Sequence, residues 1–150
     1  MKRKTVGIVV LFWDDFEKTI ECISSIYKQK KLDYSLILVD NNSQKKYSKK
    51  VLNWLKKNKK KILHVNKKIY DKKNFGSSKV CFYIKNKFNY GCGLGHNPGY
   101  KFCINNNLKY IARIDNDMIV PQKTICNLIK RFEKNRLIQG ISPKIMFAQK

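Results

Sequence analysis

Residues 5–12 read TVGIVVLF, a continuous apolar run that is rich in β-branched side chains. Such a run is typical of a strand that is covered on both faces, as in a parallel sheet, because a half-solvated strand alternates apolar and polar residues. Basic residues precede the run, but it is short, it leads into Asp14 and Asp15, and no small-residue cleavage site follows. We therefore interpret it as a buried first strand and not as a signal peptide.

Strand patterns and helix patterns alternate along the rest of the chain. Further strands are expected at residues 36–39, 62–65, 80–84, 110–114 and, more weakly, 138–147. Helices are expected at residues 16–28, 47–58, 100–107 and 122–133, and a polar loop at 74–78. This alternation predicts an α/β fold, with a mostly parallel sheet flanked by helices, in a single domain over residues 1–150.

The chain is strongly basic, with a formal net charge of +23 from 33 Lys and Arg against 10 Asp and Glu. Only Arg3, Arg113, Arg131 and Arg136 are arginines, which leaves 33 − 4 = 29 lysines. Arginine makes most bidentate contacts to phosphates and bases, so this charge gives weak support to a nucleic-acid-binding protein. It does predict attraction to anionic ligands and to membrane surfaces in general.

Cysteine and histidine usage argues against disulfides and zinc. The five cysteines are odd in number, scattered, and without any C-x-x-C spacing. We expect a reducing, cytoplasmic location for such a chain. His64 and His96 are isolated in the sequence, which also argues against a histidine-based metal site.

The tract at residues 45–61 combines an apolar stripe with many lysines. Two interpretations fit it: a helix that lies on an anionic membrane, or a helix whose stripe covers the sheet and whose lysines are solvated. Core-facing stripes are the ordinary case, and we favour the second interpretation. The stripe consists of Tyr47, Val51, Leu52 and Leu55.

Acidic residues gather where the expected strands end. Five of the ten follow strand ends directly, which is where ligands bind in open α/β sheets; they are Asp14, Asp15, Asp40, Asp115 and Asp117. Asp115 and Asp117 are two residues apart, so in an extended segment both carboxylates face the same way and can hold one cation. Taken alone, Asp115-Asn116-Asp117 equally fits a turn that caps the next helix.

The motifs resemble, in their order, the donor-binding half of family 2 glycosyltransferases, which have the GT-A fold. The quoted segments are FWDDFEKTIECI (12–23), VDNNS (39–43), NYGCGLGHNPG (89–99) and DND (115–117). The first is similar to N-W-N-G-W-E-D-T-I-E-C-L of the rhamnosyltransferase-like branch. The third matches N-x-G-x-x-x-G-x-N-x-G of the same branch. Together the four segments cover nearly the whole chain.

The resemblance implies roles for individual residues. Asp40 is expected to hydrogen-bond the base or ribose of a nucleotide, and Asp14 stands where the family usually carries an asparagine of the nucleotide pocket. The glycines of 91–99 are expected to let the backbone approach the donor closely. The implied cation is Mn²⁺ or Mg²⁺, held by Asp115 and Asp117. The full set expected to bind the nucleotide sugar is Asp14, Asp40, Asn42, Gly91, Gly95, Asn97 and Asp115.

The resemblance also implies an activity. It is the transfer, with inversion, of a sugar from a UDP- or dTDP-sugar to a hydroxyl of a saccharide or lipid-linked acceptor, in cell-surface polysaccharide synthesis. We expect a cytoplasmic protein with peripheral contact to the inner face of the membrane. The resemblance stops before the acceptor-binding half, so the general base is expected beyond residue 150. Two alternatives remain: a non-catalytic nucleotide-binding remnant and, with less support, a basic nucleic-acid-binding protein.

Overall fold

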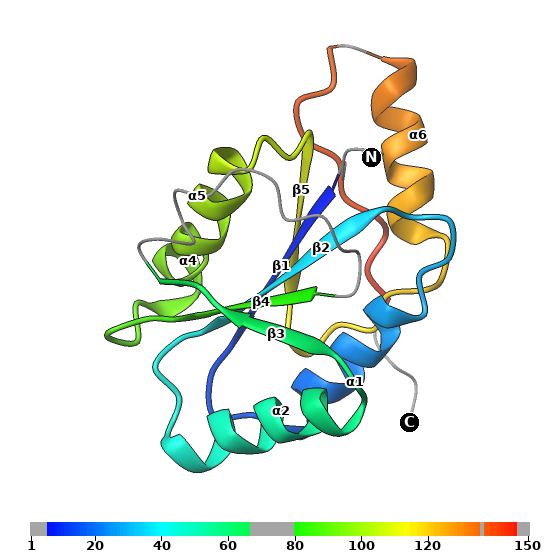
Figure 1. The fold of residues 1–150 in the computed structure, drawn as a ribbon. Coiled ribbons are helices and arrows are strands. Elements are labelled where there is room, and N and C mark those ends of the chain that lie inside the picture. Colours follow the sequence, from blue (N-terminus) through cyan, green and yellow to red (C-terminus); the bar gives the residue numbers. More distant parts are fainter. Residues whose placement is uncertain (1–5, 67–79, 136, 147–150) are drawn as a thin grey trace.

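A parallel sheet forms the centre of the molecule (Figure 1). The structure is a computed structural model, and it describes residues 6–66, 80–135 and 137–146. Within them, five parallel strands pair in the order β3-β4-β2-β1-β5. Their bounds are β1 (Val6–Phe12), β2 (Tyr34–Asp40), β3 (Lys61–His64), β4 (Val80–Lys85) and β5 (Tyr110–Asp115). The predicted α/β fold with a parallel sheet is confirmed.

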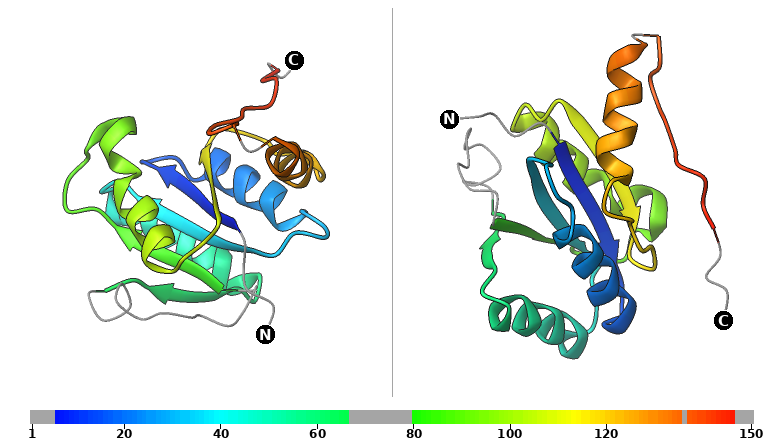
Figure 2. Two further views of the ribbon diagram at one scale, coloured as in Figure 1. Left: turned by 90° about the horizontal axis from the view of Figure 1, so that it is seen from above. Right: turned by 90° about the vertical axis from the view of Figure 1, so that its right-hand side faces the viewer.

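Helices cover both faces of this sheet (Figure 2). One core joins the sheet to α1, α2 and α6, and a second core joins the opposite face to α5. The helices are α1 (Glu17–Tyr27), α2 (Lys45–Lys57), α4 (Gly91–Gly95), α5 (Asn97–Asn105) and α6 (Thr124–Lys134). In the described part of the chain, no helix has both the length and the apolar character needed to cross a bilayer.

The two cores explain why the first strand is apolar at every position. Ile8, Val10 and Phe12 point into the core under α1 and α2, whereas Val9 and Leu11 point into the core under α5. All seven residues of β1 are buried, because β1 pairs with β2 on one side and β5 on the other. A strand between two helical layers has no solvated face on which a polar residue would be favourable.

The amphipathic helix at 45–61 also faces the sheet. Val51 and Leu55 of α2 are fully buried in the core, while Leu52 is partly buried against it. The interpretation of this stripe as core-facing is therefore confirmed. The lysines of α2 lie on its exposed side.

Two predicted elements differ in the structure, and one lies outside it. The prediction of a strand at 138–147 was wrong, because residues 138–146 form no strand. Gly140 and Pro143 interrupt this segment, and Ile145 and Met146 are exposed. The glycine-rich segment before residue 100 is helical, with α4 and α5 in place of one helix at 100–107. The loop expected at 74–78 falls outside the described residues.

Candidate functional site

A cleft of about 500 Å³ opens beyond the carboxyl ends of β1, β2 and β5. It is the edge of the sheet at which a parallel α/β fold is expected to bind ligands. The lining residues come from the strand ends and from the segment that enters α4: Leu11, Phe12, Trp13, Asn41, Asn89, Gly91, Cys92, Asp115, Asn116 and Asp117.

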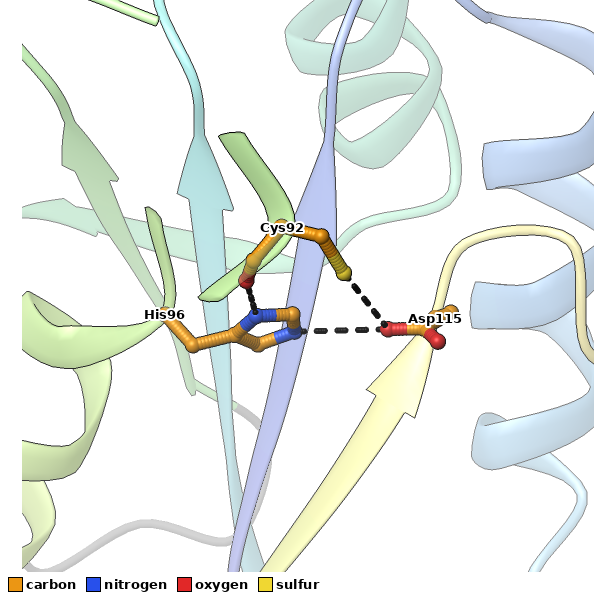
Figure 3. A group of neighbouring side chains, drawn as sticks. All are labelled: Cys92, His96 and Asp115. Atoms are coloured by element: carbon orange, nitrogen blue, oxygen red, sulfur yellow. Dashed lines mark hydrogen bonds and ion pairs between the residues drawn. The ribbon is translucent and has the colours of Figure 1, made fainter. Parts of the chain in front are cut away.

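Asp115 lies at the end of β5, where its carboxylate lies close to Cys92 and His96 (Figure 3) and also contacts Arg113. Its Oδ1 accepts a hydrogen bond from Arg113 Nη2 at 3.3 Å, and it lies 3.6 Å from His96 Nε2. The thiol of Cys92 is 3.9 Å from the same oxygen. Arg113 Nη2 also donates to Cys92 Sγ at 2.9 Å, so the guanidinium lies against both the carboxylate and the sulfur.

Asp117 is exposed and available to a ligand. Across the described ranges, its carboxylate has no hydrogen-bond or ion-pair partner, although it lines the same cleft as Asp115. Between them, Asn116 donates from Nδ2 to Thr19 Oγ1 at 3.0 Å, which fastens this turn to α1. Two carboxylates in one cleft, one of them uncommitted, supply the hard oxygen ligands that suit Mg²⁺ or Mn²⁺, so the residues present fit such a cation.

Asp40 is placed differently from Asp115 and Asp117. It is fully buried and does not line the cleft. Oδ1 accepts the backbone N–H of Ser43 at 2.6 Å, and Oδ2 accepts the hydroxyls of Ser48 and Tyr83. Burial, together with the bond to Asp40, raises the pKa of Tyr83. The contact of Asp40 with a base or ribose stays a prediction, and in this structure the carboxylate fastens the connection from β2 to α2.

Asp14 and Asn42 follow the ends of β1 and β2 but do not line the cleft. Asp14 Oδ1 accepts the backbone N–H of Gln44 at 2.6 Å, and Oδ2 accepts its side-chain amide at 3.0 Å. These bonds join the end of β1 to the first turn of α2. Asp14 and Asn42 both have positive φ, 48° and 65°, a conformation that Asp and Asn tolerate better than most residues.

Three of the four glycines of 91–99 have identifiable surroundings, and Gly93 is exposed with open space around it. Gly91 lines the cleft, with φ 67°. Gly95 and Gly99 are buried, and an added Cβ would lie 2.9 Å from Leu11 Cδ2 at Gly95 and 2.5 Å from Val9 Cγ1 at Gly99. Close packing of α4 and α5 on the sheet therefore accounts for these two glycines. Asn97 is exposed at the start of α5.

Sequence reasoning missed an asparagine network behind the cleft. Asn41 Oδ1 accepts hydrogen bonds from Asn86 Nδ2 at 2.9 Å and from the backbone N–H of Tyr90 at 3.1 Å. Asn41 Nδ2 donates to Asn89 Oδ1 at 2.7 Å. These bonds hold the segment before α4 against the end of β2. Of the neighbouring residues Asp40 and Asn41, only Asn41 lines the cleft.

His96 was also missed. Its side chain is fully buried, it stacks on Tyr100, and its Nδ1 lies 2.7 Å from the carbonyl oxygen of Cys92. Burial lowers the pKa of His96, which favours the neutral imidazole. The signal in the sequence is the spacing of Cys92 and His96, four residues apart, which places both on one side of a helical turn.

The parallel sheet with a polar cleft beyond its strand ends is the architecture of an open α/β fold, in which ligands generally bind at that edge. The family model described as "Glycosyl transferase family 2" matches residues 8–146. The chain thus belongs to family 2 of the glycosyltransferases, as its motifs predicted. No curated protein matches the sequence.

Solved structures share this fold at low sequence identity. S. aureus TarS 1–349 matches with a TM-score of 0.60 and 12% identity, over 88% of this chain and 33% of that one. The Pyrobaculum calidifontis mannosyltransferase PcManGT, in complex with GDP-Man and Mn²⁺, matches with a TM-score of 0.63 and 14% identity, again over 88% and 33%. TarS 1–349 in complex with UDP-GlcNAc gives 0.61 and 12%, over 88% and 32%. The chain thus spans about a third of the chains it resembles.

Proposed function

We propose that this domain binds the nucleotide sugar of a metal-dependent, inverting glycosyltransferase. The observation that carries the proposal is the shared cleft of Trp13, Asn41, Asp115 and Asp117 at the carboxyl end of the sheet. Family membership supports it, as do the ligands bound in the similar structures: GDP-Man with Mn²⁺ in one, and UDP or UDP-GlcNAc in others. We propose a UDP- or dTDP-sugar as the donor.

Different residues of the cleft would contact different parts of such a donor. Asp115 and Asp117 would hold the divalent cation, Mn²⁺ or Mg²⁺. When bound, this cation neutralises charge on the diphosphate as the nucleotide leaves. Trp13 is 56% exposed in the cleft wall and offers a flat ring on which a base can stack. Gly91 leaves that part of the wall without a side chain, and Asn41 fixes the same segment by donating to the carbonyl of Gly91 at 3.3 Å.

The base that deprotonates the acceptor hydroxyl is not assigned within residues 1–150. Glu133, the one acidic residue after Asp117 in the sequence, is exposed on α6 and paired with Lys109 at 3.2 Å. The hydrogen bond from Lys109 lowers the pKa of Glu133, which makes it a weaker base. We therefore assign donor binding to this domain and no catalytic base to Glu133.

The biological setting extends the same proposal. The acceptor is a saccharide or a lipid-linked saccharide, and the pathway is cell-surface polysaccharide synthesis in the cytoplasm. The exposed lysines of α2 give the domain a basic face that suits peripheral contact with an anionic membrane. The face is formed by Lys45, Lys46, Lys49, Lys50, Lys56 and Lys57.

Calorimetric titration with UDP- and dTDP-sugars in the presence of Mn²⁺ tests the proposal. We expect binding that a chelator weakens and that Asp117→Asn weakens at least about tenfold, the size of effect that even a lost outer-shell partner of a metal produces. Glu21→Gln, an exposed carboxylate on α1 outside the cleft, is the matched control and should bind as the wild type does. Binding that ignores both the chelator and Asp117→Asn would contradict the proposal, as would salt-sensitive DNA binding with no response to any sugar nucleotide.

A further inference from the structure

Beside the cleft lies a second set of metal-ligating atoms, two of whose residues, Cys92 and Asp115, line the cleft (Figure 3). Cys92 lies in α4, His96 lies between α4 and α5, and Asp115 ends β5. Cys92 Sγ, His96 Nε2 and an oxygen of Asp115 all lie within 4.8 Å of one another. Segments far apart in the sequence thus converge on one point.

The orientation of the buried imidazole indicates that this point suits a cation. A carbonyl oxygen only accepts hydrogen bonds, so the 2.7 Å contact from His96 Nδ1 to the Cys92 carbonyl places the ring proton on Nδ1. In the neutral ring, Nε2 then presents a lone pair to Asp115 Oδ1 at 3.6 Å. Nε2 is fully buried and has no hydrogen-bond partner in the described structure. Two acceptors that face each other without a proton between them are stabilised by a positive ion.

We propose that Cys92, His96 and Asp115 form a binding site for Zn²⁺ or a similar borderline-soft divalent ion. Thiolate, imidazole and carboxylate together are a donor set that selects such ions, whereas Mg²⁺ prefers oxygen alone. Bond lengths of about 2.0–2.3 Å in a tetrahedral site put ligand atoms about 3.5 Å apart. The separations to Asp115 Oδ1 are 3.6 and 3.9 Å, and the sulfur and the imidazole nitrogen lie within 4.8 Å of each other, so the three groups must draw together to hold an ion. Water completes the coordination, and the thiol proton of Cys92 passes to the buffer.

Arg113 takes the place of the ion in this structure. Its Nη2 lies 2.9 Å from Cys92 Sγ and 3.3 Å from Asp115 Oδ1, so one guanidinium contacts two of the three proposed ligands. The side chain is 47% exposed and can turn into solvent when an ion enters. Arg113 is therefore expected to compete with the metal, and its removal is expected to tighten metal binding.

The site shares Asp115 with the pair proposed to hold the cation of the nucleotide sugar. If the proposed function holds, Zn²⁺ at Cys92 and His96 draws Asp115 away from that pair and weakens donor binding. This consequence rests on the proposed function, whereas the metal site itself does not. The two are distinguished by measuring metal binding first without any nucleotide.

Titration of the untagged, full 150-residue chain with Co²⁺ tests the site. A cobalt–thiolate bond gives a charge-transfer absorption band in the near ultraviolet, which reports the sulfur ligand directly. We expect this band at one equivalent of Co²⁺, and we expect Zn²⁺ to abolish it by displacement. Cys92→Ser should remove the band, while Cys126→Ser, at a partly exposed cysteine on α6, should leave it unchanged.

His96→Asn should weaken Co²⁺ binding at least about tenfold, and circular dichroism checks that this buried substitution still folds. Arg113→Gln changes a partly exposed side chain and leaves the buried His96 in place. It should tighten Co²⁺ binding several-fold, a gain that general damage to the protein does not produce. The site would be overturned by a missing band in the wild type, by a band that survives Cys92→Ser, or by weaker metal binding in Arg113→Gln.

Discussion

Replacing Gly99 by alanine tests whether the glycine-rich segment serves packing or ligand approach. A Cβ at Gly99 would lie 2.5 Å from Val9 Cγ1 and 3.1 Å from Val39 Cγ2, about 1 Å inside ordinary carbon contact for the first. Both valines are fully buried on central strands, so neither side chain can turn away. Overpacking of this kind costs about 1–3 kcal/mol, and we expect the upper part of that range.

The helix propensity of alanine offsets part of this cost. Gly99 lies within α5, and alanine is favoured over glycine there by up to ~1 kcal/mol. The expected net loss is about 1–2 kcal/mol in the free energy of unfolding, which for a chain of this size corresponds to a melting temperature lower by about 2–8 °C. Urea unfolding followed by circular dichroism measures the first quantity, and thermal unfolding measures the second.

Gly93→Ala is the matched control in the same glycine-rich segment. No heavy atom lies within 4 Å of a Cβ at Gly93, so this change should be neutral or stabilising by up to ~1 kcal/mol. Because Gly99 lies outside the cleft lining, Gly99→Ala should also leave the intrinsic affinity for a nucleotide unchanged in the folded fraction. A Gly99→Ala protein as stable as the wild type, or one that is stable but no longer binds, would refute the packing argument.

Two further predictions concern buried groups. Asp40→Asn keeps the shape of the side chain but presents an amide in place of a carboxylate to the hydroxyls of Ser48 and Tyr83. In urea titrations it should lower the free energy of unfolding by about 2–3 kcal/mol. A loss below about 1 kcal/mol would count against the buried network. Burial raises the pKa of the Cys22, Cys81 and Cys103 thiols from 9.0 to about 12. A thiol reagent should therefore modify these three only after unfolding, whereas the exposed Cys92 should react fast in the native protein. Because the unfolded chain loses these thiol protons at lower pH than the folded chain does, their contribution to stability is full below pH 9 and is lost as the pH rises toward 12. A fast reaction of all five cysteines in the native protein would contradict this burial.

The fold was predictable because its strands lie between two helical layers. Burial on both faces favours a continuous apolar run such as residues 6–12, and parallel pairing requires a crossover between strands, here helical, so local patterns predict the architecture. The segment at 138–146 shows the limit of this reasoning. Its apolar residues suggested a strand, but a strand also needs a neighbour with free hydrogen-bonding groups, and that depends on tertiary placement.

The place of the candidate site at the strand ends was predictable, but its detailed lining was not. Asp115 and Asp117 line one cleft, as expected because residues that follow parallel strands share one edge of the sheet, and their ligand contacts stay predictions. Asp40 follows a strand as well, but its side chain turns inward to Ser43, Ser48 and Tyr83, and the choice between inward and outward depends on partners that are distant in the sequence. The same holds for His96, whose neighbour Asp115 is 19 residues away along the chain.

The most direct test of the central claim is the paramagnetic broadening of amide NMR signals when Mn²⁺ and a UDP-sugar are added together. The account predicts broadening centred on Asp115–Asp117 and spreading to the other wall of the cleft at Trp13, Asn41 and Gly91. The buried end of α5 around Phe102 should be much less affected, since it packs on the face of the sheet behind the strand ends. Broadening centred anywhere else on the molecule would contradict a cation-dependent nucleotide-sugar site in this cleft.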